Sequence, residues 1–124
     1  MTSQDLYTIH DVDLEGQKLH ARISLNADHE IYSGHFPDTP VTPGVCQVNM
    51  VRDGISLATE SKLYLAEAKS IKFLSMLPPD EKDLNLTLEY TLDGETYKVK
   101  SELTSGDKTF LKFSGVFAKD LSGK

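Results

Sequence analysis

The chain has 124 residues, of which 39% are hydrophobic, and its formal net charge is -6. This length suits one domain, and the acidic balance argues against nucleic acid as the main partner, because phosphate binding needs a basic face. The single cysteine, Cys46, excludes an intrachain disulfide. No signal peptide and no apolar stretch of membrane-spanning length is visible. These observations predict one soluble, cytoplasmic domain over residues 1–124.

Two strands are predicted in the first quarter of the chain. Residues 6–12 form the first, and Glu15 and Gly16 mark the turn that follows it. In residues 18–25 apolar and polar side chains alternate, which is the period-two pattern of a half-buried strand. Residues 26–34 are polar and predict a loop.

One helix is predicted over residues 43–60. Thr42 is a favourable N-cap, and Pro43 suits the first helical position, where its missing N–H costs nothing. Val45, Val48 and Ile55 belong to a run of apolar side chains at helical spacing. Such a helix would be about 27 Å long. Because it is apolar on most sides, it needs a sheet wrapped around it.

Four further strands are predicted after the helix, over residues 65–74, 84–92, 97–103 and 110–118. The leucine stripe of residues 84–92 is most simply core, and Asp93-Gly94 is a strong hairpin signal. Residues 119–124 are polar and predict a frayed tail. Strands on both sides of one long apolar helix indicate an α+β fold with an antiparallel sheet around that helix.

The segment with the strongest chemical signal is GHFPDTPVTPGV, residues 34–45. Its three prolines stiffen a loop, and Gly34 and Gly44 allow close approach of the backbone to a ligand. Gly44 falls in the first helical turn, where free N–H groups attract a developing oxyanion. His35 can exchange a proton near neutral pH.

This segment closely resembles the active-site segment of the hotdog-fold 3-hydroxyacyl-acyl-carrier-protein dehydratases, in which GHFP precedes PVxPGV and the central helix. The order of elements extends the resemblance over most of the chain. The resemblance implies a hotdog fold, with an antiparallel sheet wrapped around one long central helix. It also implies a lyase that dehydrates a 3-hydroxyacyl thioester in fatty-acid or related polyketide-like synthesis, without a cofactor.

The resemblance also assigns roles to residues. His35 would remove the proton next to the thioester carbonyl, and the Gly44 N–H would hold the carbonyl oxygen. The family's carboxylate, which serves the leaving hydroxyl, falls on Asn49, fourteen residues after the histidine. An amide does not donate a proton as an acid does, and a missing general acid costs roughly 10²–10⁴ in rate. Residues that would contact the substrate are Phe36, Pro43, Val45 and Val48.

Several side chains near the motif keep a second interpretation. Asn49 fits either a role in positioning water or plain helix packing, and Asp38, where the family usually has glycine, is a second source of a carboxylate. Cys46 is better explained as a small buried hydrophobe than as a nucleophile. Gln47 is near Asn49 but is also an amide, so it does not supply the missing carboxylate. His10, His20 and His29 lack ligand spacing, so no metal is predicted.

Partners and alternative functions follow from the same resemblance. The acyl group would arrive on acyl carrier protein or coenzyme A, and the tunnel that receives it lies between two subunits in the family. A homodimer or a larger hotdog assembly, including one with a different subunit, is therefore expected. The alternatives are a hotdog thioesterase and a non-catalytic hotdog subunit that binds acyl thioesters or a catalytic partner. Lys69, Lys72 and Arg52 are either carrier contacts or solvated charges.

Overall fold

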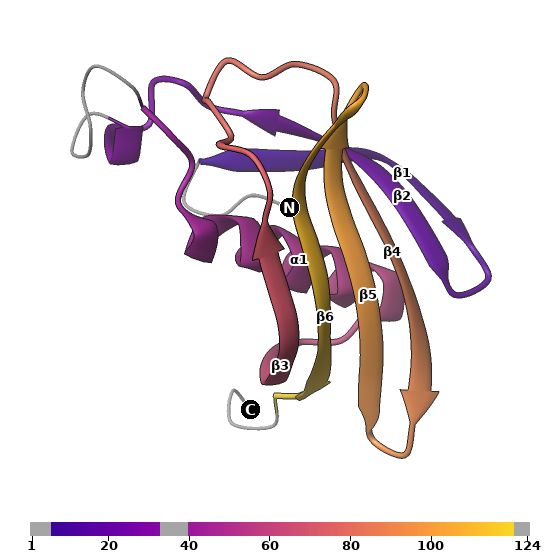
Figure 1. The fold of residues 1–124 in the computed structure, drawn as a ribbon. Coiled ribbons are helices and arrows are strands. Elements are labelled where there is room, and N and C mark those ends of the chain that lie inside the picture. Colours follow the sequence, from indigo (N-terminus) through magenta and orange to yellow (C-terminus); the bar gives the residue numbers. More distant parts are fainter. Residues whose placement is uncertain (1–5, 33–39, 121–124) are drawn as a thin grey trace.

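A computed structural model describes residues 6–32 and 40–120 (Figure 1). In this part of the chain one six-stranded antiparallel sheet has the strand order β1-β2-β4-β5-β6-β3, and helix α1 lies against one of its faces. The elements in chain order are β1 (Tyr7–Glu15), β2 (Lys18–Leu25), the 3-10 turn η1 (Glu30–Tyr32), α1 (Gly44–Thr59), β3 (Leu63–Phe73), β4 (Leu84–Asp93), β5 (Thr96–Ser105) and β6 (Lys108–Lys119).

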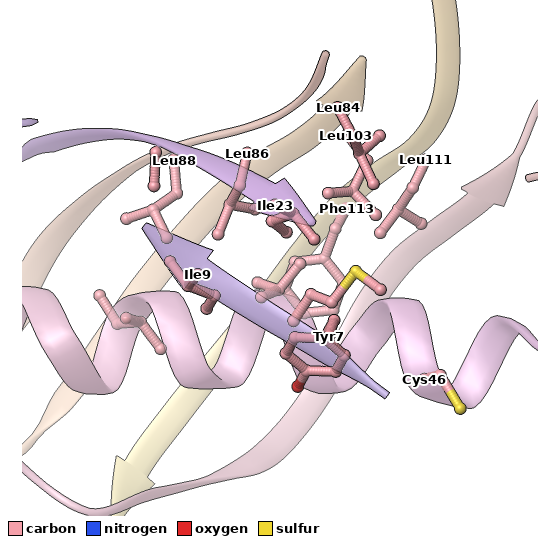
Figure 2. Packing of buried hydrophobic residues seen from close by; sticks show 14 of the residues in the cluster. Tyr7, Ile9, Ile23, Cys46, Leu84, Leu86, Leu88, Leu103, Leu111 and Phe113 are labelled. Atoms are coloured by element: carbon pink, nitrogen blue, oxygen red, sulfur yellow. The ribbon is translucent and has the colours of Figure 1, made fainter. Parts of the chain in front are cut away.

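The core lies between α1 and the inner face of the sheet. Met50, Val51 and Ile55 on the helix are fully buried, and α1 contacts every strand of the sheet. Alternate residues of the strands point at the helix, because side chains in a strand alternate between its two faces. Figure 2 shows this set, which includes Ile9, Ile23, Leu84, Leu86, Leu88, Leu103, Leu111 and Phe113. The expected α+β hotdog arrangement is confirmed.

The leucine stripe of β4 is core for only part of its length. Leu84, Leu86 and Leu88 are buried, whereas Leu92 is 56% exposed. The hairpin that joins β4 to β5 projects beyond α1 (Figure 1), so its end has no helix to pack on. The expectation of a buried stripe to residue 92 was therefore wrong at its far end.

Three tight turns of the sheet contain glycine, and the turns at Gly16 and Gly94 were expected from the sequence. Gly16, Gly94 and Gly106 have φ values of 62°, 65° and 57°. This left-handed region is strained for residues with a Cβ. Each of the three glycines joins two antiparallel neighbours, β1 to β2, β4 to β5 and β5 to β6. The turns fix the register of the sheet and hence which strand residues face α1.

The start of α1 differs from the prediction. Pro43, with φ -59° and ψ 150°, is the N-cap, and no side chain caps the helix. Thr42 does not serve as N-cap, because its hydroxyl lies 2.8 Å from the Tyr32 hydroxyl and the two share a hydrogen bond. The backbone N–H of Thr42 donates to the Leu77 carbonyl at 2.7 Å. Residues before the helix are thus held by tertiary contacts.

The end of the chain extends slightly further into the sheet than expected. β6 includes Lys119, and the Asp120 N–H donates to the Lys62 carbonyl at 2.8 Å. The rest of the predicted tail, residues 121–124, lies outside the described residues. α1 ends at Thr59, one residue before the predicted end, with Glu60 in the left-handed conformation at φ 54°.

Candidate functional site

The predicted site divides between described and undescribed residues. His35, Phe36 and Asp38 lie outside the described part of the chain, so their predicted roles stay predictions. Gly44 and Asn49 are both on α1, where the first and second helical turns place them. The structure therefore shows the helical side of the predicted site.

Gly44 is the first residue of α1 and packs against the end of β3. A Cβ built at this position would lie 2.6 Å from Cζ of Phe73, closer than real Cβ contacts come. The absence of a side chain lets the aromatic ring approach the helix backbone. The first N–H groups of a helix have no acceptor within the helix. The Gly44 N–H is therefore suited to hold an anionic oxygen, as the family resemblance implies.

The residues predicted to contact substrate lie around this helix start. Pro43 and Val48 are half-buried, and Val48 packs against the core. Val45 is 68% exposed, although it is an apolar residue in the first turn of the helix. An exposed valine beside Gly44 offers an apolar surface for the predicted contact with an acyl chain.

Tyr32, Thr42 and Gln47 form a polar cluster beside the start of α1. Gln47 is 3% exposed, and its Nε2 donates to the Thr42 carbonyl at 3.1 Å. Its Oε1 is buried and has no hydrogen-bond partner among the described residues. Burial raises the pKa of Tyr32, while its hydrogen bond to Thr42 acts in the opposite direction. The cluster holds the end of the motif against the helix.

Cys46 lies beside this cluster on the buried side of α1. It is 9% exposed, and burial raises the pKa of its thiol. A nucleophilic cysteine needs a lowered pKa, because the thiolate is the reactive species. The interpretation of Cys46 as a small buried hydrophobe agrees with this environment.

Asn49 is half-buried in the second turn of α1. It stands four residues before Asp53, and residues spaced in this way lie side by side on one side of a helix. Asp53 is 7% exposed, and its Oδ2 accepts a hydrogen bond of 2.5 Å from the hydroxyl of Tyr7. Sequence reasoning missed this carboxylate. Its signal was an acidic residue that interrupts the apolar side of the predicted helix.

The remaining histidines and charges have ordinary surroundings. Nε2 of His10 lies 2.7 Å from the Ser24 hydroxyl, Nε2 of His20 lies 3.1 Å from Oδ1 of Asn85, and Nδ1 of His29 accepts from the Ile31 N–H at 3.0 Å. Within residues 6–32 and 40–120, no three His, Cys, Asp or Glu side chains gather as a metal site.

A groove of about 690 Å³ is lined by residues of β1, β2, β3, β4, β5 and β6, most of them polar or charged. Its lining includes Lys18, Glu89, Lys100, Glu102 and Lys112. Gly44 and Asn49 do not line this groove. This groove is therefore separate from the helical side of the predicted site. Among the described helices, none is long and apolar enough to cross a membrane.

Comparisons with known proteins agree with this arrangement. Residues 11–114 match the model of the ApeI-like family, described as ApeI dehydratase. The chain is 31% identical over 87 residues to the 3-hydroxyacyl-[acyl-carrier-protein] dehydratase FabZ of Ligilactobacillus salivarius, and 29% identical over 87 residues to FabZ of Oenococcus oeni. Each match covers 64% of this chain and 60% of the relative, so the chain matches less than two thirds of these relatives' length.

Solved structures show the same fold. One belongs to the dehydratase heterocomplex ApeI:P from Xenorhabdus doucetiae, with a TM-score of 0.66, 19% identity, and coverage of 90% of this chain and 97% of that one. Another is a conserved protein of Pseudomonas aeruginosa, with a TM-score of 0.69, 17% identity, and coverage of 94% and 90%. These likenesses concern the fold, and the family match covers most of the chain. The chain is a diverged member of the ApeI-like dehydratase family of hotdog proteins.

Proposed function

We propose that this protein dehydrates a 3-hydroxyacyl thioester carried by acyl carrier protein, in fatty-acid or related polyketide-like synthesis. The observation that carries the proposal is Gly44 in the first turn of α1, with its backbone packed against Phe73 and directly after the PVTP sequence of the motif. The FabZ relatives act on 3-hydroxyacyl groups of acyl carrier protein by name. Synthesis on acyl carrier protein is a cytoplasmic process, and we propose that location for this chain.

In the proposed dehydration, each step is assigned to one of a few groups. His35 removes a proton from C2 of the acyl chain, and the Gly44 N–H donates to the thioester oxygen as negative charge grows there. A helix N-terminus favours that charge through its dipole and its free N–H groups. Val45 and Val48 offer apolar contact to the acyl chain. Elimination of water then needs a proton for the leaving hydroxyl, and Asn49 does not provide one.

We propose a homodimer formed along β3. This strand is an edge of the sheet, and it and the segment that follows carry exposed apolar side chains. Tyr64, Phe73, Leu74 and Met76 are between 50% and 70% exposed, and we call them the apolar β3 edge. Unpaired edges with apolar side chains tend to be covered by another chain. Because Phe73 touches Gly44, a partner at this edge would adjoin the site.

A second candidate is a subunit that binds acyl thioesters within a mixed hotdog assembly. The amide of Asn49 at the position of the family's carboxylate favours it. The solved relative from Xenorhabdus doucetiae is part of a dehydratase heterocomplex. In this case the chain alone would bind an acylated carrier without converting it.

One assay separates these functions. Purified full-length protein is mixed with a crotonyl thioester of acyl carrier protein or of coenzyme A, and loss of the enoyl absorbance is followed together with release of free thiol. Hydration without thiol release supports the dehydratase. Thiol release alone would indicate a thioesterase. Binding of an acylated carrier without either reaction would support the non-catalytic subunit and overturn the proposal.

A further inference from the structure

The buried carboxylate of Asp53 has no role in the proposed function as described so far. Asp53 belongs to the third turn of α1, and its side chain is 10% exposed. Its Oδ2 accepts the hydroxyl hydrogen of Tyr7, a residue of β1 that is 1% exposed (Figure 2). Its Oδ1 lies 3.5 Å from Nη2 of Arg52, which is longer than an ordinary hydrogen bond. Among the described residues, one carboxylate oxygen is thus fixed by a hydrogen bond, and the other has only this longer contact with Arg52.

Packing alone does not account for this pair. Burying a carboxylate is unfavourable unless the group is hydrogen-bonded, and an apolar pair of similar volume is often at least as stable. Phe at position 7 and Leu at position 53 would fill the same space without that loss of hydration. Buried ionisable groups close to a predicted site are candidates for chemistry.

The position of Asp53 connects it with the predicted site. Asn49 stands where a carboxylate is expected, and Asp53 follows it by one helical turn on the same side of α1. The Cβ atoms of such a pair are about 5–6 Å apart. The helix therefore carries a carboxylate beside the amide, displaced by one turn from the expected position.

We propose that Asp53 is the acid that protonates the leaving hydroxyl, with Asn49 hydrogen-bonding the same oxygen. This inference rests on the proposed dehydratase function. As His35 takes the C2 proton, the electron pair of that C–H bond forms the C2–C3 double bond and the C3–O bond breaks. The departing oxygen takes its proton from Oδ1 of Asp53, and water leaves. Tyr7 donates to Oδ2 and stabilises the carboxylate that remains, and solvent carries a proton from His35 back to Asp53.

The direct test replaces Asp53 by its amide in the full-length protein. Asp53→Asn keeps the shape of the side chain and is expected to lower kcat for crotonyl-thioester hydration by about 10²–10⁴-fold, the contribution of a general acid or base. Glu60→Gln is the matched control, because it removes an exposed carboxylate at the end of the same helix and should leave the rate unchanged. Thermal unfolding of each variant reports on the fold.

A relocated carboxylate gives the sharper test. In Asn49→Asp/Asp53→Asn the amide and the acid exchange places, and activity should recover by roughly tenfold or more over Asp53→Asn. Tyr7→Phe keeps the acid but removes its hydrogen-bond donor, so kcat should fall roughly tenfold. Tyr7→Phe tests the role of the carboxylate even where Asp53→Asn unfolds, because it leaves Asp53 in place.

The outcomes separate this inference from the function on which it rests. Full activity of Asp53→Asn in a protein whose hydration depends on His35 would overturn the role of Asp53 and leave the dehydratase intact. Equal loss of activity and stability in Asp53→Asn, with no recovery in the exchange variant, would show a structural role only and also overturn it. An unmodified protein that hydrates no thioester would remove both proposals.

Discussion

A methyl group at Gly54 would lie 2.7 Å from Cδ2 of Leu86, which is fully buried on β4. Gly54 thus sets how closely α1 approaches the sheet. Contact under 3.0 Å requires a shift of one partner, and a leucine enclosed on all sides has little room to move.

Gly54→Ala is therefore expected to destabilise the fold. Overpacking costs about 1–3 kcal/mol, and the better helix propensity of alanine offsets about 1 kcal/mol of that. The net loss in the free energy of unfolding should be about 1 kcal/mol, measured by urea denaturation. The double variant Gly54→Ala/Leu86→Ala should be less destabilised than the sum of the two single variants. Additive losses would contradict a direct clash.

His35→Ala tests the proton carrier of the proposed reaction. The expected result is a fall of at least about a hundredfold in kcat for crotonyl-thioester hydration, because a positioned general base contributes 10²–10⁴-fold. His20→Ala is the control, since His20 is exposed on β2 and bonds only the side chain of Asn85 among the described residues. Equal rates for the two variants would take His35 out of the mechanism.

Ionisation of the Cys46 thiol is expected to make the free energy of unfolding depend on pH in the alkaline range. Burial raises the pKa of its thiol above the ordinary value of 9.0. The folded chain keeps this proton to higher pH than the unfolded chain, so the stabilisation is present below about pH 9 and is lost as pH rises through the raised pKa. The free energy of unfolding of the unmodified protein should therefore fall as the pH is raised above about 9.

Cys46→Ala checks the origin of that dependence. It should flatten the fall over the same range, although it lowers the overall stability. Tyr32, whose pKa is also raised from 10.0, remains in this variant and accounts for a later decrease. Identical pH dependence in Cys46→Ala and the unmodified protein would assign the whole effect to other groups.

The apolar β3 edge predicts the oligomeric state. Leu74→Lys/Met76→Lys introduces two charges there and should convert a dimer into a monomer at micromolar concentration, measured by light scattering, because buried unpaired charges oppose association. Leu14→Lys is the control at the opposite edge, where Leu14 on β1 is 46% exposed. Dissociation by Leu14→Lys alone would place the interface on β1.

The arrangement of strands and helix could be predicted from the sequence because each element carries a local signal. Residues 84–88 alternate between apolar and polar, and β4 buries Leu84, Leu86 and Leu88 accordingly. Gly94 marks a turn that requires positive φ. The apolar spacing from Val45 to Ile55 predicted the helix to within one residue at each end. These signals depend on a few neighbouring residues, and backbone geometry limits how they can be satisfied.

Contacts between distant segments could not be predicted in this way. Thr42 has the chemistry of an N-cap, but the hydroxyl of Tyr32, from the preceding η1 turn, forms a hydrogen bond with its hydroxyl instead. Asp53 accepts a hydrogen bond from Tyr7, a residue 46 positions away, only because the fold packs α1 against β1.

The sequence by itself determined the motif, the glycine at the helix start and the amide at position 49. Only the tertiary structure decided that the carboxylate one turn beyond that amide is buried and accepts a hydrogen bond from Tyr7. The physical reason is that the surroundings of a side chain are set by the packing of distant elements, whereas its chemical identity and its place along the helix are already present in the chain.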